Sequence, residues 1–200
     1  MKLHYPLIVI IILIAFPQIL SADSHPVRNI ILKGNESFSN RQIKALMQTQ
    51  VGESYDEELL QQDFDRIIDF YYERGFRFAR IDAERLFIKK FSDGVYLRIY
   101  IDEGKIGQIT VEGNTHTQSH VIIRELLFQV GSIYTREDEL ESERILRRKP
   151  YLGSAEIHAT RDPETMLVWM QVEVTDLWTF IPAFDLSSFN KDNADVFVSL

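Results

Sequence analysis

Two stretches of the chain alternate strictly between apolar and polar or variable positions. Ile30 and Leu32 occupy every second position in the first stretch, and Ile109 and Val111 do so in the second. This period of two predicts half-buried β-strands. A Gly-Asn pair follows each stretch, at 34–35 and 113–114, and glycine adopts positive φ at little cost. The chain is therefore expected to turn out of both strands at these pairs.

Two helices are expected after each of these strands. Apolar residues recur at helical spacing over about 41–48 and 121–129, which predicts a short helix in each place. A longer helix is expected from a cap at Asp56 to Gly75. Its counterpart is expected to begin at Thr135, where Thr and Asp three residues apart resemble a capping box, and to end before Pro150.

A hairpin is expected to follow each pair of helices. The sequences "SDG" at 92–94 and "DPET" at 162–165 are typical of tight turns, because Gly allows positive φ and Pro presets φ. The strands of the hairpins are expected at Phe78–Ala83 and Val95–Glu103, and at Ser154–Ala159 and Val168–Asp176.

These elements recur in one order because the chain contains an internal repeat. Gly34 and Gly113 are 79 residues apart, as are Tyr55 and Tyr134, and the offset falls to 76 and then 73 where loops are expected. We therefore predict an α+β fold of two tandem β-α-α-β-β modules, at 27–103 and 106–176. Each is expected to be a three-stranded mixed sheet covered by two helices. The link "DEGKIG" at 102–107 is short, so the modules are expected to hold a restricted angle.

Composition and charge exclude several classes of protein. The chain has 200 residues, a formal net charge of −8 and no cysteine. The acidic balance argues against nucleic acid as a partner, since binding to phosphates needs a basic face. The absence of cysteine rules out a disulfide framework and a thiolate zinc site.

Both ends of the chain differ from the repeat. A basic start, an apolar run from Leu7 to Phe16 and a small residue at Ala22 predict a signal peptide over residues 1–22, with an uncleaved anchor over Leu3–Leu20 as the alternative. From Leu177 the chain alternates again and is rich in aromatic residues. The segment 177–200 is expected to be the incomplete start of an outer-membrane β-barrel, with Trp178 as a membrane-interface anchor.

The repeat, its element order and the phrase "IDEGKIGQITVEGNTHTQ" resemble POTRA (polypeptide-transport-associated) domains of outer-membrane assembly factors such as BamA and TamA. In that family a domain characteristically ends in Glu-Gly, here Glu103-Gly104, and the next domain opens with an Ile-x-(Ile/Val)-x-Gly-Asn strand, here Ile109 to Asn114. A Gly-x-x-Tyr link before the long helix is also typical, and it matches 52–55 and 131–134.

The resemblance implies assembly of outer-membrane proteins or translocation of polypeptides at the outer membrane of a Gram-negative-type bacterium, with the POTRA modules in the periplasm. Unfolded outer-membrane or secreted polypeptides and periplasmic accessory subunits would be the partners, without a cofactor. In this family the first hairpin strand is an open edge that accepts an added strand. The edge residues mapped from the family are Phe76, Arg77, Phe78, Ala79, Arg80, Ile81, Asp82, Ser154, Ala155, Glu156, Ile157 and His158.

The resemblance leaves two other functions open. A membrane-anchored POTRA scaffold of the cell-division type and a two-partner secretion transporter are the alternatives. His116 and His120 are four residues apart, but a solvated loop explains them better than a metal site. No nucleophile–base pair or carboxylate pair indicates an enzyme. Tyr96 and Tyr100, with Phe78, are candidates either for contact with apolar substrate side chains or for packing against a neighbouring helix or module.

Overall fold

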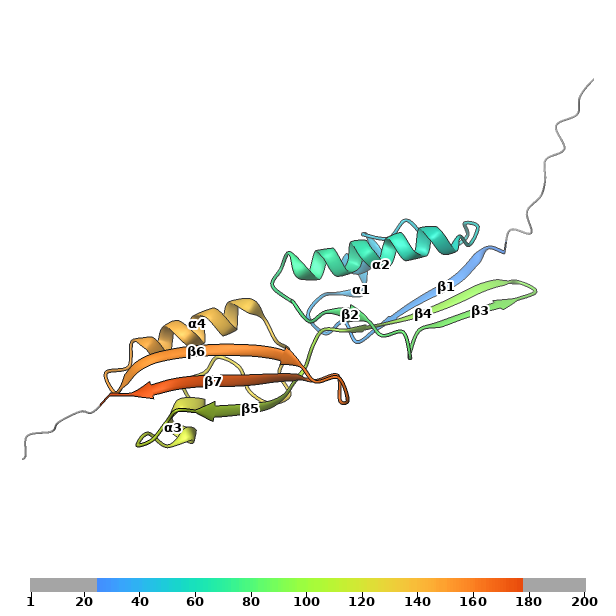
Figure 1. Ribbon diagram of the computed structural model, residues 1–200. Helices are drawn as coiled ribbons and strands as arrows, with labels where there is room; N and C mark the ends of the chain where they lie inside the picture. Colours follow the sequence, from blue (N-terminus) through green and yellow to red (C-terminus); the bar gives the residue numbers. More distant parts are fainter. Residues whose placement is uncertain (1–24, 178–200) are drawn as a thin grey trace, which may run out of the picture.

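The computed structural model describes residues 25–177, which form two α/β modules arranged end to end (Figure 1). We name the part from β1 to β4 module 1 and the part from β5 to β7 module 2. The elements are β1 (Val27–Lys33), α1 (Asn40–Lys44), α2 (Glu57–Tyr72), β2 (Arg80–Ile81), β3 (Phe87–Phe91), β4 (Gly94–Asp102), β5 (Ile106–Glu112), α3 (Ser119–Ile123), α4 (Arg136–Arg147), β6 (Leu152–Arg161) and β7 (Val168–Asp176).

Each module is built on a mixed sheet with its last strand in the centre. In module 2 the strand order is β5-β7-β6, with β5 parallel and β6 antiparallel to β7. In module 1, β1 lies parallel to β4, and both β2 and β3 pair antiparallel with the other edge of β4. The prediction of a three-stranded sheet therefore holds for module 2, whereas module 1 has a fourth strand.

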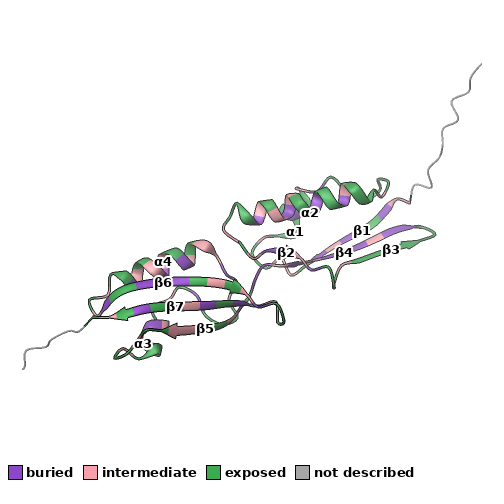
Figure 2. Ribbon diagram, viewed as in Figure 1, coloured by how far each residue is buried: buried purple, intermediate pink, exposed green. Residues whose placement is uncertain are grey.

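Each sheet buries one face beneath its long helix (Figures 1 and 2). Val95, Leu97, Ile99 and Ile101 alternate along β4, and all four are buried in the core of module 1. Their counterparts on β7 are buried in a separate core in module 2. Burial of such a side chain contributes about 1.5–3 kcal/mol, so the predicted alternation supplies a large part of the stability of each module.

The predicted caps of the long helices are confirmed. The Asp56 side chain accepts hydrogen bonds from the N–H groups of Glu58 and Leu59, at 2.8 and 3.1 Å. The Thr135 side chain accepts one from the N–H of Asp138, at 3.1 Å. A side-chain acceptor at this position satisfies backbone donors that the first helical turn leaves free. Helices α2 and α4 therefore begin where the sequence places them.

The short helices end earlier than the apolar spacing predicts. The N–H groups of Gln48 and Thr49 donate to the Asp63 carboxylate on α2, at 2.7 and 2.8 Å. In module 2, the N–H of Leu127 donates to the Ser142 hydroxyl on α4, at 2.9 Å. A side chain on the long helix thus takes the backbone donors that a continued helix would have used. Such a tertiary contact is not visible in the periodicity of a local window.

The turns after β1 and β5, which we call the Gly-Asn loops (34–39 and 113–118), approach the central strand closely. Gly34 and Gly113 have φ values of 79° and 81°. A Cβ on Gly34 would lie 2.1 Å from the carbonyl oxygen of Ile101, and one on Gly113 would lie 2.0 Å from that of Val174. Only glycine allows both the backbone conformation and this approach.

A carboxylate at the end of the central strand holds each Gly-Asn loop. Glu103, which is 3% exposed, accepts from the N–H of Ser37 at 3.0 Å and from the hydroxyl of Tyr71 at 2.6 Å. At the equivalent position of module 2, Asp176 accepts from the N–H groups of His116 and Thr117, at 2.6 and 3.1 Å. The His116 N–H is the main cause that lowers the pKa of Asp176 to about 2.

Some sequence-based predictions fall outside the residues that the structure describes. They are the signal peptide over 1–22, the alternative anchor over Leu3–Leu20, Trp178 and the barrel strands after Leu177. Among residues 25–177, no helix is long and apolar enough to span a bilayer.

The close approach at Gly113 predicts the outcome of a matched pair of substitutions. Gly113→Ala should lower the free energy of unfolding by about 3 kcal/mol or more, because it adds a collision to the cost of positive φ. Gly131→Ala is the control, since Gly131 also has positive φ but has no atom within 4 Å of its added Cβ. It should cost about 1–2 kcal/mol. Urea unfolding measures both, and equal losses would contradict the importance of the close approach.

The lowered pKa of Asp176 predicts a pH-dependent contribution to stability. Its folded-state pKa of about 2 lies below the ordinary value of about 3.9. The stabilisation is therefore complete above about pH 5 and is lost progressively as the pH falls toward 2. The stability advantage of the wild type over Asp176→Asn should shrink across this range in urea titrations. A difference that stays constant from pH 6 to pH 2 would rule out this contribution.

Candidate functional site

Both modules have a groove between the long helix and the neighbouring edge of the sheet. The groove in module 1 has a volume of about 590 Å³ and lies between α2 and the strand β2 with the residues that flank it. The groove in module 2 has a volume of about 390 Å³ and lies between α4 and β6. Of the predicted edge residues, Ala79, Arg80 and Ile81 line the groove of module 1, and Arg77, Glu156, Ile157 and His158 line the groove of module 2. The same place in the fold is thus hollowed twice.

Strand β6 forms a long edge with backbone groups directed away from the sheet. The N–H of Asp162 donates to the carbonyl of Leu167 at 2.9 Å, so these residues form a hydrogen-bonded pair. Hydrogen-bonded and non-hydrogen-bonded pairs alternate along an antiparallel ladder. The N–H and C=O groups of Ala155, Ile157 and Ala159 therefore point outward, and one of them, the carbonyl of Ala155, accepts from Arg147 Nε at 2.9 Å.

The side chains along β6 divide between the core and solvent. Ala155 and Ile157 are buried, whereas Ser154, Glu156 and His158 are exposed. Ser154 donates to the Thr175 hydroxyl at 3.0 Å, and His158 Nε2 lies 3.8 Å from the Glu156 carboxylate. All five are predicted edge residues. The structure places them in one strand beside one groove.

Charged side chains from both modules line the groove of module 2. Glu139 on α4 is 2% exposed and accepts hydrogen bonds from Arg136 and from the hydroxyl of Tyr134. Arg77 of module 1 approaches the same carboxylate to 3.6 Å. Burial, and then the hydrogen bond to Glu139, raises the pKa of Tyr134 well above its ordinary value, so the hydroxyl keeps its proton. Arg77 therefore belongs to the groove of module 2 although it precedes β2.

The predicted edge of module 1, from Phe76 to Asp82, is wrong in extent, because only Arg80 and Ile81 of these residues form a strand. Phe76 packs on Tyr71 in the core, with ring centroids 5.5 Å apart. Asp82 is 6% exposed and accepts from the N–H of Glu84 at 3.0 Å, which turns the chain out of the sheet. The first of these residues thus packs in the core and the last forms a turn, so the segment does not form a continuous edge strand.

The edge of module 1 continues in β3, which the sequence analysis missed. All five residues from Phe87 to Phe91 are exposed, and they pair with the first half of β4. The turn at 92–94 held a signal for this strand, since a two-residue hairpin loop requires its strands to flank it directly. If the strand were at Phe78–Ala83, residues 84–91 would separate it from that turn, and a tight hairpin has no room for them.

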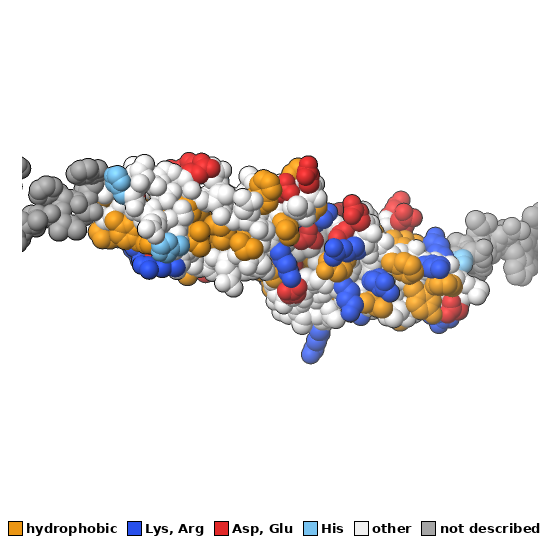
Figure 3. All heavy atoms as spheres, turned by 90° about the horizontal axis from the view of Figure 1, so that it is seen from below, with side chains coloured by type: hydrophobic (Ala, Val, Ile, Leu, Met, Phe, Trp, Pro, Cys, Tyr) orange, Lys and Arg blue, Asp and Glu red, His pale blue; other side chains and the backbone are white. Residues whose placement is uncertain are grey.

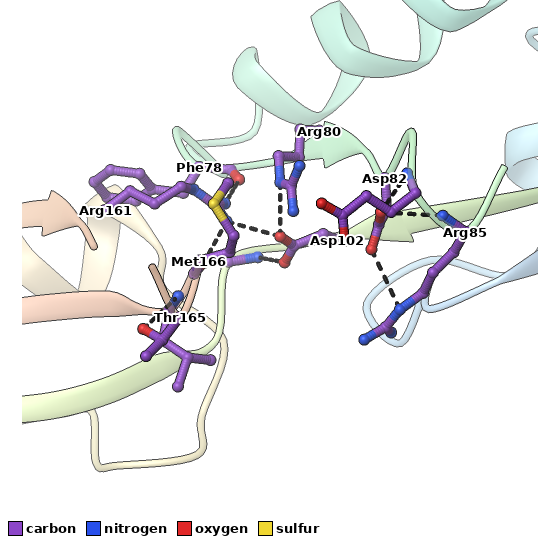
Figure 4. Close-up of polar contacts among 11 residues, drawn as sticks. Phe78, Arg80, Asp82, Arg85, Asp102, Arg161, Thr165 and Met166 are labelled. Atoms are coloured by element: carbon purple, nitrogen blue, oxygen red, sulfur yellow. Dashed lines mark hydrogen bonds and ion pairs between the residues drawn. The ribbon is translucent and has the colours of Figure 1, made fainter. Parts of the chain in front are cut away.

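Phe78 and Arg161 form the junction between the modules (Figure 4). The Phe78 ring lies edge-on to Tyr134 of module 2, with centroids 4.7 Å apart. Arg161, at the end of β6, donates to the carbonyl of Phe78 and, at 2.7 Å, to the carboxylate of Asp102. The N–H of Arg136 also donates to the carbonyl of Gly75, at 2.9 Å. These contacts restrict the angle between the modules. Phe78 therefore packs against the neighbouring module.

Asp102 is the charged centre of the junction (Figure 4). Burial by itself would raise its pKa, but the N–H of Gly104 and the guanidinium groups of Arg161 and Arg80 hold that pKa below its ordinary value. Arg80 Nε lies 3.0 Å from the Asp102 carboxylate. A residue of each module thus shares one carboxylate, which couples the end of β6 to β2.

This geometry predicts that Asp102→Asn loosens the junction. The substitution removes the charge shared by two arginines and should lower the free energy of unfolding by about 2 kcal/mol. Small-angle scattering should also show a broader distribution of molecular dimensions. Glu36→Gln is the matched control, because it breaks the exposed ion pair of Glu36 with Lys105 in the linker. An equal effect of both substitutions would contradict a role for Asp102 in fixing the angle.

Comparison with known proteins places the chain in one family. The model described as "POTRA: Surface antigen variable number repeat" matches residues 25–104 and again residues 105–175. A putative outer membrane protein assembly factor of Treponema pallidum (strain Nichols) is 21% identical over 138 residues. That match covers 68% of this chain but only 16% of the relative, so the chain spans about a sixth of its length.

Solved structures share the fold at low sequence identity. The N-terminal domain of Omp85 from the cyanobacterium Thermosynechococcus elongatus superposes with a TM-score of 0.66 at 18% identity, covering 78% of this chain and 68% of that one. CdiB from Escherichia coli superposes with a TM-score of 0.57 at 20% identity, covering 84% of this chain and 30% of that one. With both repeats matched by the family model, the chain belongs to the POTRA family and carries two of its domains in tandem.

Proposed function

We propose that the two modules act in outer-membrane protein assembly or polypeptide translocation, where they bind unfolded outer-membrane or secreted polypeptides in the periplasm by β-augmentation. The observation that carries this proposal is the outward-facing backbone of β6 beside the groove along α4. An extended polypeptide that pairs with this edge would become a fourth strand of the sheet in module 2. The proposal assigns binding and no bond chemistry to the chain, with accessory subunits as further partners.

The central part of β6 is the segment best suited to pair with an added strand. At one end, Arg147 already occupies the carbonyl of Ala155, and at the other end Arg161 is held in the junction. The N–H and C=O groups of Ile157 and Ala159 lie between these two arginines. Each backbone hydrogen bond contributes about 1 kcal/mol net, so pairing over this short window favours weak and reversible binding.

Backbone pairing also explains how one site could accept many clients. Main-chain groups are the same in every polypeptide, so the edge itself selects for an extended conformation. The groove beside it carries both signs of charge, because it is lined by Arg136 and Arg147 as well as by Glu143 and Glu156. Such a mixed lining gives no strong preference for the net charge of the client. This suits a protein that binds unfolded chains of many different sequences.

The outward N–H of Ala159 provides the test of this proposal. Ala159→Pro removes that donor without removing a ladder bond, and proline is tolerated at such edge positions. Photo-crosslinking to a peptide of alternating apolar and polar residues should fall about fivefold, since one hydrogen bond is lost. Ala159→Ser keeps the N–H and should crosslink like the wild type. Unchanged crosslinking of Ala159→Pro, with an unchanged circular dichroism spectrum, would exclude the β6 edge as the site.

A further inference from the structure

The sheet of module 1 has an outer face on which aromatic and cationic side chains alternate. Helix α2 covers the opposite face (Figure 1). We call this outer surface the basic aromatic face, and its residues are Ile31, Phe87, Lys89, Phe91, Tyr96 and Arg98. Seen from below, orange and blue side chains are interleaved over module 1 (Figure 3). Phe87 and Phe91 are 40% and 44% exposed and lie on the same side of one strand, so they form a patch rather than isolated apolar residues.

This face is hollowed between two rows of side chains that run across the strands. Arg98 lies between Ile31 on β1 and Phe87 on β3, and in the next row Tyr96 lies opposite Lys89. A hollow of about 390 Å³ opens over these rows and is lined by five of the six residues of the face, all except Lys89. Its size suits one or two side chains of a partner rather than a flat surface.

The cations of the face contact aromatic rings instead of carboxylates. The Arg98 guanidinium carbon lies 5.5 Å from the centroid of Phe87, and Lys89 Nζ lies 4.9 Å from that of Phe91. Within residues 25–177, neither cation has a carboxylate oxygen within 4 Å. Stacking on a ring uses the face of a guanidinium group and leaves its N–H donors free to bind an anion. Among the residues that the structure describes, Asp93, whose carboxylate accepts from the Tyr96 hydroxyl at 2.8 Å, is the one acidic residue that lines this hollow, so Lys89 and Arg98 give the face an excess of positive charge.

The fold itself does not require these cations, as the second copy demonstrates. Gln171 on β7 occupies the position of Arg98, and Thr160 on β6 pairs with Trp169 as Lys89 pairs with Tyr96. Outside the six residues of the face, Glu112 of β5 occupies the position of Lys33. Glu173 likewise replaces Tyr100. The outer face of module 2 is thus acidic on the same sheet architecture. The cationic and aromatic side chains of module 1 are a property of this copy, which points to a ligand rather than to stability.

We propose that the basic aromatic face binds an acidic polypeptide segment that carries aromatic or other apolar side chains. In an extended chain, alternate side chains are about 7 Å apart, and this is also the spacing of Phe87, Lys89 and Phe91 along β3. Carboxylates of the partner would pair with Lys89 and Arg98, and its apolar side chains would fill the hollow beside Phe87 and Phe91. The site uses side chains on a sheet face, so it is distinct from backbone pairing at β6.

The concave shape and the short rows favour a polypeptide over a membrane surface. A bilayer is flat at this scale, so it attracts cations that protrude from a convex surface. Each protruding cation strengthens the binding to the bilayer. Here the cations lie back against rings on their own sheet. A single extended segment can reach both the cations and the hollow, whereas lipid headgroups in one plane would contact only the most protruding atoms.

Binding of two labelled peptides by charge-neutral variants tests the inference. The probes are a fluorescein-labelled heptapeptide of alternating phenylalanine and aspartate, and the same peptide with lysine in place of aspartate. The double variant Lys89→Gln with Arg98→Gln should raise the dissociation constant for the acidic peptide at least about tenfold, as measured by fluorescence anisotropy. Glutamine already occupies the second of these positions in module 2, so the fold should tolerate it. The control is Arg41→Gln with Lys44→Gln, the same change of charge on α1, which should bind like the wild type.

The outcomes separate this inference from the proposed function. Loss of acidic-peptide binding in the Lys89→Gln and Arg98→Gln variant, but not in the control, supports the inference. This holds whatever effect Ala159→Pro has at the β6 edge. Equal binding of the acidic and basic peptides, or an unchanged dissociation constant in the double variant, would overturn it. Vesicles of phosphatidylglycerol and phosphatidylcholine are tested in parallel by flotation. Retention on these vesicles through Lys89 and Arg98, without binding of the acidic peptide, would assign the face to a membrane and also overturn the inference.

Discussion

The contact between a carboxylate and the backbone of a Gly-Asn loop is the constraint on which each module depends. The first and last strands of a module are parallel, so the chain must leave the sheet, pass through two helices and return. Glu103 and Asp176 bind the departing loop to the end of the returning strand. Because a glycine at the start of the loop lies against that strand, the loop and the strand end meet without a gap. The core then closes beneath the long helix.

The two copies share this frame but use the edge opposite β1 or β5 differently. In module 2 the edge is one uninterrupted strand of ten residues. In module 1 the corresponding chain supplies Phe76 to its own core and Phe78 to the junction, which leaves a two-residue strand and a turn before β3. A backbone segment that makes these contacts cannot also present a continuous edge. The junction therefore makes module 2 the better candidate for strand addition.

Most of the candidate site could be predicted in module 2 and little of it in module 1. Ile157 and its neighbours alternate between buried and exposed positions and lie directly between Pro150 and a turn. The alternation and the place in the chain therefore predict the same strand. In module 1 the same mapping selected Phe78, whose ring packs on Tyr134, more than 50 residues further along the chain. The position beside the turn at 92–94 indicated β3, but the correspondence of 78–83 with 154–159 in the repeat placed the expected strand earlier in the chain. The similarity between the copies therefore gave a wrong prediction where the chain of module 1 forms the junction instead of a long edge strand.

By itself, the sequence determined what depends on neighbouring residues and on composition. It established the order of the elements apart from β3, the caps at Asp56 and Thr135, the buried face of β4 and the turns at Gly34 and Gly113. These features follow from local geometry and from the burial of apolar surface, which the pattern of side chains reports directly. Tertiary structure alone decided where the short helices stop, that Arg77 lines a groove of the other module and that Arg161 reaches Asp102. Each of these depends on a contact between residues distant in the chain, and no local pattern records such a contact.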